Sequence, residues 1–235
     1  MRPLLLVTRP AGLAEETADM ARAAGFDAII APLLDIEPVP FSLPPGPFDA
    51  LLFTSPQAPA RAGLDALQLA VPVFAVGERT AAAAEAAGHA VVATGSEDMS
   101  GIVSTIASRG HRRILHLCGE IRTAIDVPAH LAVVQVPVYE ARAVPELGKA
   151  AADALRARTV FATLLFSPRT ASTFSALVDV AGIDRGRQQI IAISPRAASA
   201  AGAGWLGVAV ADQPSSAAML CAASRLWQRR AHDPD

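Results

Sequence analysis

The strongest constraint on the fold of this chain is an internal repeat, because segments of its first half recur in its second half in the same order. Each copy contains short apolar runs separated by stretches rich in alanine. The matching segments are 52–56 with 164–168, 73–77 with 190–194, 91–93 with 208–210, and a helix containing Ile102 and Val103 with one containing Met219 and Leu220. Such a series, kept in register, indicates an internal duplication and therefore two units of one fold.

Apolar runs alternate with alanine-rich stretches along the whole sequence, and glycine closes several of these stretches. Residues 4–7 and 72–76 are typical of buried strands, and the helix predicted after each of them ends at Gly25 and at Gly88. Glycine is favoured just past the end of a helix, so these positions mark the returns to the next strand. The alternation predicts βαβ units, and hence the α/β class with parallel sheets.

The first βα unit, residues 4–32, comes before the first copy of the repeat. If each unit needs a full sheet, this segment must join the second copy. The chain then passes between the units twice, at 33–40 and at 137–145. Both segments are extended and contain prolines, so they predict a hinge of two strands.

The sequence therefore predicts two similar parallel-sheet α/β lobes, of which one is discontinuous. We expect the discontinuous lobe to consist of 1–36 and 142–235, and the inserted lobe of 37–141. Proteins with two lobes and a hinge usually bind a ligand between the lobes.

The composition is that of a globular chain with a sizeable core. The residues are 52% hydrophobic and 18% charged, and the net charge is −2 without a basic block, which argues against nucleic acid or a charged membrane as partner. No apolar stretch approaches the roughly 20 residues of a membrane span. Cys118 and Cys221 are far apart and outside any CxxC motif, which fits a reduced, cytoplasmic protein.

The common cofactor and catalytic motifs are missing from the places where they would act. No GxGxxG segment follows residues 4–7, and the sequence has no GxxxxGK[ST], GxSxG or HExxH segment and no Cys/His spacing that would hold zinc. His116 and Cys118 alternate on one predicted strand, and we interpret them as structural. We therefore expect no cofactor and no metal, and an enzyme built this way would act by positioning and electrostatics.

The loops after the predicted strands combine a hydroxyl group or a glycine with an arginine. In open α/β sheets these loops meet helix N-termini, whose N–H groups favour anions. Helix capping explains any one such loop better, but several loops at one edge predict a set of anion-binding groups. The candidates are Thr8, Arg9, Ser55, Gly77, Thr80, Gly119, Arg122, Ser167 and Ser194.

Tyr139 is the only tyrosine of the chain and lies where the second crossing begins. A phenol at that place could donate a hydrogen bond or a proton to a ligand held between the lobes. The alternative is an aromatic side chain that anchors the strand.

Taken together, these segments resemble the uroporphyrinogen-III synthases. Residues 76–81 are similar to the Gly-x-x-Thr-Ala turn of that family, and 118–122 are similar to its Gly-x-x-Arg segment. The remaining segments that carry the resemblance, in the order of the family, are 7–10, 52–56, 138–145 and 166–168.

The resemblance implies two α/β lobes with a two-stranded linker, and a cyclising hydro-lyase of haem biosynthesis. Such an enzyme converts hydroxymethylbilane to uroporphyrinogen III without a cofactor, losing water and inverting the last pyrrole ring. The resemblance assigns loss of the hydroxyl to Tyr139, and substrate carboxylates to Ser55, Gly77, Thr80 and Ser167. It further implies a monomer in transient contact with hydroxymethylbilane synthase.

Ser194 and Ala197 depart from the family, which usually has Gly and Thr at these positions. The departure leaves open a second hypothesis, a non-catalytic ligand-binding or regulatory module of the same architecture. A third hypothesis is a hinge-bending enzyme for another anionic metabolite, such as a phosphorylated sugar.

Overall fold

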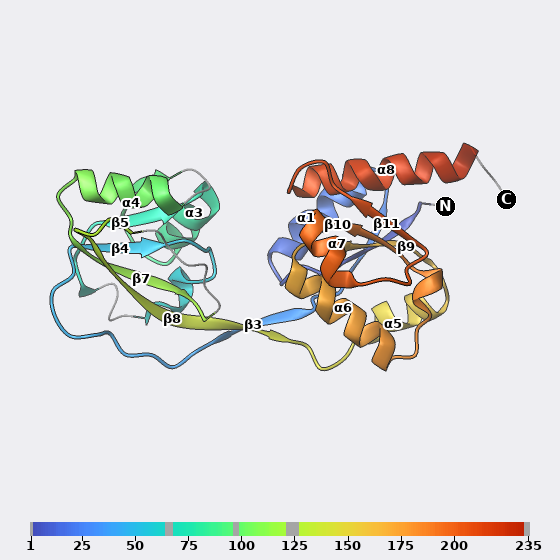
Figure 1. The fold of residues 1–235 in the computed structure, drawn as a ribbon, viewed down its shortest axis with the longest axis horizontal. Helices are drawn as coiled ribbons and strands as arrows, with labels where there is room; N and C mark the ends of the chain where they lie inside the picture. The colour runs from blue at the N-terminus through green and yellow to red at the C-terminus, as the bar shows by residue number, and fades with distance from the viewer. Residues whose placement is uncertain (1, 64–67, 96–98, 121–126, 233–235) are drawn as a thin grey trace. The chain divides into compact units, whose positions relative to one another are not determined.

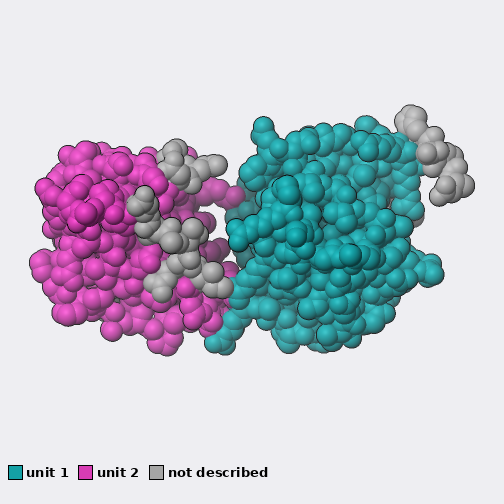
Figure 2. All heavy atoms as spheres, in the orientation of Figure 1, with its two compact units in different colours: residues 1–35, 142–235 teal, residues 36–141 magenta. Residues whose placement is uncertain are grey.

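The computed structural model describes residues 2–63, 68–95, 99–120 and 127–232. The chain divides into two compact units, and Figure 2 colours them separately. Unit 1 consists of Met1–Asp35 with Arg142–Asp235, and unit 2 of Ile36–Ala141.

Unit 1 contains a five-stranded parallel sheet with the strand order β11-β10-β9-β1-β2 (Figure 1). Its strands are β1 (Leu4–Val7), β2 (Asp27–Ile30), β9 (Val160–Leu165), β10 (Gln189–Ala192) and β11 (Gly207–Val210). Its helices are α1 (Leu13–Ala23), α5 (Lys149–Arg156), α6 (Pro168–Val180), α7 (Pro195–Ala201) and α8 (Ser216–His232), with the 3-10 turn η2 (Arg185–Arg187).

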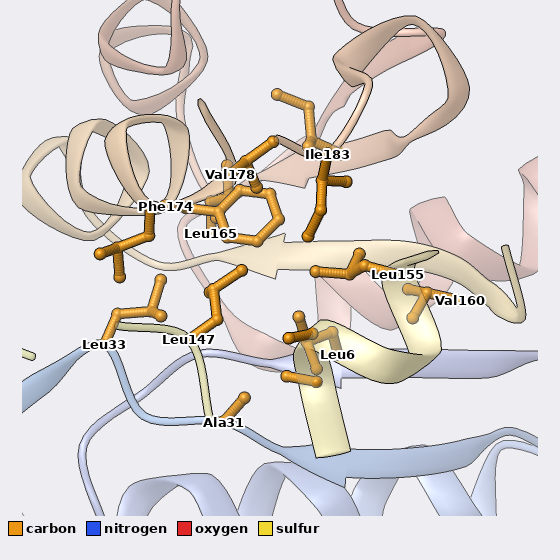
Figure 3. Packing of buried hydrophobic residues seen from close by; sticks show 14 of the residues in the cluster. Leu6, Ala31, Leu33, Leu147, Leu155, Val160, Leu165, Phe174, Val178 and Ile183 are labelled. Atoms are coloured by element: carbon orange, nitrogen blue, oxygen red, sulfur yellow. The ribbon is translucent and has the colours of Figure 1, made fainter. Parts of the chain in front are cut away.

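Helices cover both faces of this sheet because side chains alternate along each strand. Leu6 points into a cluster formed with α5, α6 and α7, where Phe174 and Leu155 are fully buried (Figure 3). Its neighbours Leu5 and Val7 point the other way, into a cluster formed with α1 and α8. Apolar side chains on both faces explain why β1 and β9 are continuous hydrophobic runs in the sequence.

Unit 2 contains a six-stranded sheet with the order β3-β8-β7-β4-β5-β6. Its strands are β3 (Leu34–Pro38), β4 (Ala50–Phe53), β5 (Val73–Val76), β6 (Val91–Gly95), β7 (Arg113–Gly119) and β8 (Ala132–Ala143), and β3 and β8 run across the boundary between the units. The described helices are η1 (Pro59–Arg61), α3 (Glu78–Ala86) and α4 (Met99–Ser108). Strands β8 to β6 pair in parallel.

The two sheets share one arrangement with different chain connections. In unit 2 the strands run β8-β7-β4-β5-β6, and in unit 1 the same places hold β2-β1-β9-β10-β11. The repeated segments therefore correspond as β4, β5 and β6 with β9, β10 and β11. Strand β1 of the first βα unit pairs with β9 of the second copy of the repeat.

The chain from Phe26 to Pro40 is divided into β2 and β3, with Pro32 between them. After β4 the chain forms the 3-10 turn η1, and 64–67 lie outside the described residues. Within the described residues, no helix is long and apolar enough to cross a membrane.

The fold predicts a pH-dependent stability of unit 2 through His89. This side chain is 6% exposed and packs edge-on against Phe53, with ring centroids 5.0 Å apart. Burial lowers the pKa of His89 below its usual 6.5. The unfolded chain therefore binds more protons than the folded chain just below pH 6.5, so unit 2 should lose stability as the pH falls through that range.

Hydrogen exchange of the β4 and β5 amides measures this dependence in unit 2 alone. In His89→Leu the loss of protection between pH 7.5 and 5.5 should be smaller, while His130→Gln, at an exposed position of the same unit, should match the wild type. An equal loss in all three proteins would rule out His89 as the cause.

Candidate functional site

Three loops of unit 2 reach the same level at the carboxyl edge of its sheet. Phe53 at the end of β4 lies opposite Ala75 of β5 and Leu117 of β7. Two residues beyond this row, the three chains reach Ser55, Gly77 and Gly119. Since adjacent strands lie about 4.8 Å apart, these predicted residues come together at one edge.

Gly77 begins helix α3 in a conformation that requires glycine, with φ +80°. The Thr80 N–H and the Ala81 N–H both donate to the Gly77 carbonyl, at 3.0 and 3.1 Å. The Thr80 side chain is 3% exposed, so it packs inside the first turn. Gly77 has no side chain to cap the helix, so this end presents bare backbone.

Gly119 and Tyr139 are in direct contact. They are partners in the β7–β8 ladder, just after a register shift at Cys118 and Gly119. A Cβ atom on Gly119 would lie 2.9 Å from Cε2 and Cζ of Tyr139, so the ring occupies the space that a side chain there would need. The Glu120 N–H donates to the Tyr139 carbonyl at 2.9 Å, which fixes the strand at this point.

The described residues also contain a polar relay beside this edge that the sequence interpretation missed. His116 is 3% exposed, and its Nε2 lies 2.9 Å from Thr54 Oγ1. The Gln135 amide lies 3.4 Å from Nδ1. If that amide donates to Nδ1, Nε2 carries the hydrogen and donates to Thr54, which leaves the Thr54 hydroxyl hydrogen to be donated elsewhere.

His116 is thus structural, as interpreted, but it also orients a hydroxyl next to Ser55. The alternation of His116 and Cys118 on one strand gave no hint of this contact, because Thr54 is 62 residues away in sequence. The Ser55 hydroxyl itself accepts a hydrogen bond from the Gln57 N–H at 3.2 Å.

In unit 1, the corresponding edge lies past β1, β9 and β10. Thr8 is fully buried, and its hydroxyl donates to the Leu164 carbonyl at 2.6 Å, so it ties β1 to β9. The Arg9 guanidinium lies over the Phe166 ring, 4.8 Å from its centroid, and donates to Ser216 Oγ at 2.9 Å. Arg9 is therefore a cation held in place at this edge by contacts from β9 and α8.

Ser167 and Ser194 start their helices in the same way. Ser167 Oγ accepts from the Thr170 N–H at 3.0 Å, and Ser194 Oγ accepts from the Ala197 N–H at 3.2 Å. Both serines are extended, with φ −161° and −156°, and a proline follows each at the first helical position. Ser194 thus supplies a hydroxyl cap where Gly77, its counterpart in unit 2, supplies none.

The two edges are rich in hydrogen-bond donors suited to anions. Backbone N–H groups at the starts of α3 and α6, three serine hydroxyls and the Arg9 guanidinium match carboxylate or phosphate groups. Arg122, which the sequence analysis also predicted as a binding residue, lies outside the described residues.

Comparison with known families decides where this architecture belongs. The family model described as uroporphyrinogen-III synthase HemD matches residues 15–221. The chain belongs to this family.

A solved structure from another organism has a similar fold. The chain is similar to a crystal structure of uroporphyrinogen-III synthetase from Helicobacter pylori, with 20% sequence identity, a TM-score of 0.59, and coverage of 96% of this chain and 100% of that one. A mutant uroporphyrinogen III synthase from Thermus thermophilus matches at 16% identity and a TM-score of 0.49, over 97% of this chain and 99% of that one. No curated protein matches the sequence significantly.

The cap geometry predicts that Ser167→Ala lowers the free energy of unfolding of unit 1 by about 1 kcal/mol, because the Thr170 N–H loses its partner. Both tryptophans, Trp205 and Trp227, belong to unit 1, so fluorescence during denaturant unfolding reports this unit. Ser172→Ala, an exposed position within α6, is the matched control and should change stability little. Equal stability of the two variants would contradict the capping role.

Proposed function

We propose that this protein is the cyclising hydro-lyase that converts hydroxymethylbilane to uroporphyrinogen III. The family match over residues 15–221 carries this proposal. Donor groups at the carboxyl edge of each sheet support it, because the substrate implied by the family resemblance carries several acetate and propionate carboxylates.

We further propose that the carboxyl edge of each unit binds carboxylate groups of the substrate. The chain passes from one unit to the other at Asp35–Ile36 and again at Ala141–Arg142, in strands β3 and β8. Hydrogen bonds from Val39 N–H to the Val138 carbonyl and from Val144 N–H to the Leu33 carbonyl pair these strands in antiparallel fashion on both sides of the boundary. A two-stranded link of this kind suits a hinge that closes on a flexible anion.

Catalysis in this proposal depends on positioning. The substrate hydroxyl takes a proton and leaves as water, and the last pyrrole ring attacks through its substituted carbon to give a spiro intermediate. Donors at both edges hold the carboxylates so that this carbon, and not the free one, meets the reacting methylene. Without that restraint the bilane cyclises with its last pyrrole ring not inverted.

Tyr139 is the candidate group that assists loss of the hydroxyl. Its side chain is half-buried at the β7 edge, and Gly119 leaves room for its ring. A phenol placed there can donate a hydrogen bond to a departing oxygen. Gly77, Thr80 and Ser55 of unit 2 and Ser167 of unit 1 would hold carboxylates.

The isomer of the product tests the proposal directly. Purified protein supplied with hydroxymethylbilane made in situ by hydroxymethylbilane synthase should yield the III isomer, as read by chromatography of the oxidised porphyrins. Formation of the I isomer alone, as in buffer, would overturn the catalytic proposal and favour a ligand-binding module of the same architecture.

Tyr139→Phe should reduce kcat by about 10²-fold, the usual contribution of a positioned proton donor, with little change in KM. Gly119→Ala should also lower kcat, because its new Cβ displaces the ring, while circular dichroism of both variants stays that of the wild type. Unchanged turnover in Tyr139→Phe would return this residue to the role of a strand anchor.

The same proposal includes a cytoplasmic monomer that receives its substrate in transient contact with hydroxymethylbilane synthase. Sedimentation of the purified chain tests the monomer, since a stable dimer would contradict it.

A further inference from the structure

Unit 1 has a concave site at the opposite end of its sheet from Arg9 and Ser167. A pocket of about 430 Å³ opens where β1 and β9 begin, at Leu4 and Val160. It is lined by residues of both strand starts, of the turn after α5 and of α8. Binding pockets for small molecules have volumes of roughly 300–1,000 Å³, so this one can enclose a compact ligand.

An aromatic pair forms the apolar wall of this pocket. Trp227 on α8 packs edge-on against Phe161 of β9, with ring centroids 5.1 Å apart and an interplanar angle of 84°. Phe161 is buried, whereas Trp227 is 37% exposed and is one of few large apolar side chains left open to solvent. An exposed indole beside a pocket offers a surface on which a planar ring can pack.

Three arginines surround this wall. Arg2, Arg158 and Arg230 line the pocket, and among the described residues none of them has an ion pair or a side-chain hydrogen bond. Several other arginines of unit 1 pair with carboxylates, as in Arg22–Asp19 at 2.7 Å, Arg185–Asp179 at 2.6 Å and Arg225–Asp212 at 2.8 Å. The pocket by contrast gathers three guanidinium groups that have no carboxylate partner within the described residues.

Arg158 occupies a position that is held by glycine after α1, α3 and α6. It follows α5 with φ +59°, and its N–H and that of Thr159 donate to the Leu155 and Ala154 carbonyls at 3.1 and 3.0 Å. Gly25, Gly88 and Gly182 make the same pair of hydrogen bonds after α1, α3 and α6, with φ +89°, +90° and +63°. A side chain is unfavourable in this conformation, and such exceptions concentrate at functional sites.

We propose that this pocket binds a small aromatic anion. Its ring packs on Trp227, and two or more carboxylate or phosphate groups pair with Arg2, Arg158 and Arg230, whose planar forks match such groups. A nucleotide and a pyrrole with acidic side chains both have this chemistry. The proposal does not rest on the catalytic function, because the pocket lies at the amino ends of the strands.

Titration calorimetry and Trp227 fluorescence test the proposal in the full chain. Trp205→Phe removes the other tryptophan and leaves Trp227 as the sole indole reporter. The probes are adenosine diphosphate and a monopyrrole with acetate and propionate side chains, and citrate serves as the anion without a ring. At least one aromatic probe should bind saturably and about tenfold more tightly than citrate, and the stronger probe identifies the source of the ligand.

Arg158→Gly separates binding from folding. Glycine adopts φ +59° more easily than arginine does, so the unfolding midpoint of the variant should equal or exceed that of the wild type. The affinity of the variant for the bound probe should fall by about tenfold. Arg230→Gln should weaken binding similarly. Arg229→Gln removes the same charge from the neighbouring residue outside the pocket lining and should bind as the wild type does.

Three results would overturn the proposal. They are saturable binding of neither aromatic probe, wild-type affinity in Arg158→Gly, and a loss in Arg229→Gln equal to that in Arg230→Gln.

Discussion

Parallel strand pairing is the constraint on which the rest of this structure depends. A chain that leaves one strand and enters a parallel neighbour must return along the sheet, and in this protein mostly helices make the return. Every such return begins at the carboxyl edge, so the backbone N–H groups of the helix starts gather there. The donors at Gly77, Ser167 and Ser194 are therefore a consequence of topology, and anion recognition needs only small residues that keep those donors open.

The two copies of the repeat have diverged within that constraint. Gly77 keeps a bare, positive-φ start for α3, whereas Ser194 caps α7 with its own hydroxyl in an extended conformation. The family's usual glycine is thus replaced by a residue that satisfies a backbone donor locally. In unit 1 the Arg9 guanidinium over Phe166 adds a cation to the edge. The two edges offer different donors to a ligand although their sheets share one strand arrangement.

Local patterns predicted the strands, most helix ends and the membership of β1 in the second copy, because periodicity and glycine at helix ends are local signals. The contact between Gly119 and Tyr139 was not predictable, since it depends on a register shift in the β7–β8 ladder. The relay from Gln135 through His116 to Thr54 joins residues from three different strands or strand ends. The hydrophobic periodicity of the sequence does not determine how those strands align with one another. Arg158 was overlooked for a related reason, because a positive φ at a residue other than glycine gives no sequence signal.

The position of β1 in the middle of its sheet has a consequence for synthesis of the protein. The Thr8 hydroxyl bonds the Leu164 carbonyl across 156 residues, and β1 is flanked by β2 and β9. The amino-terminal strand therefore leaves the ribosome early but lacks one neighbour until most of the chain has followed. By that time all strands of the parallel sheet in unit 2 have been synthesised, so the inserted unit can fold first. Leu5, Leu6 and Val7, which are fully buried in the folded unit, therefore lack part of their apolar cover during that interval.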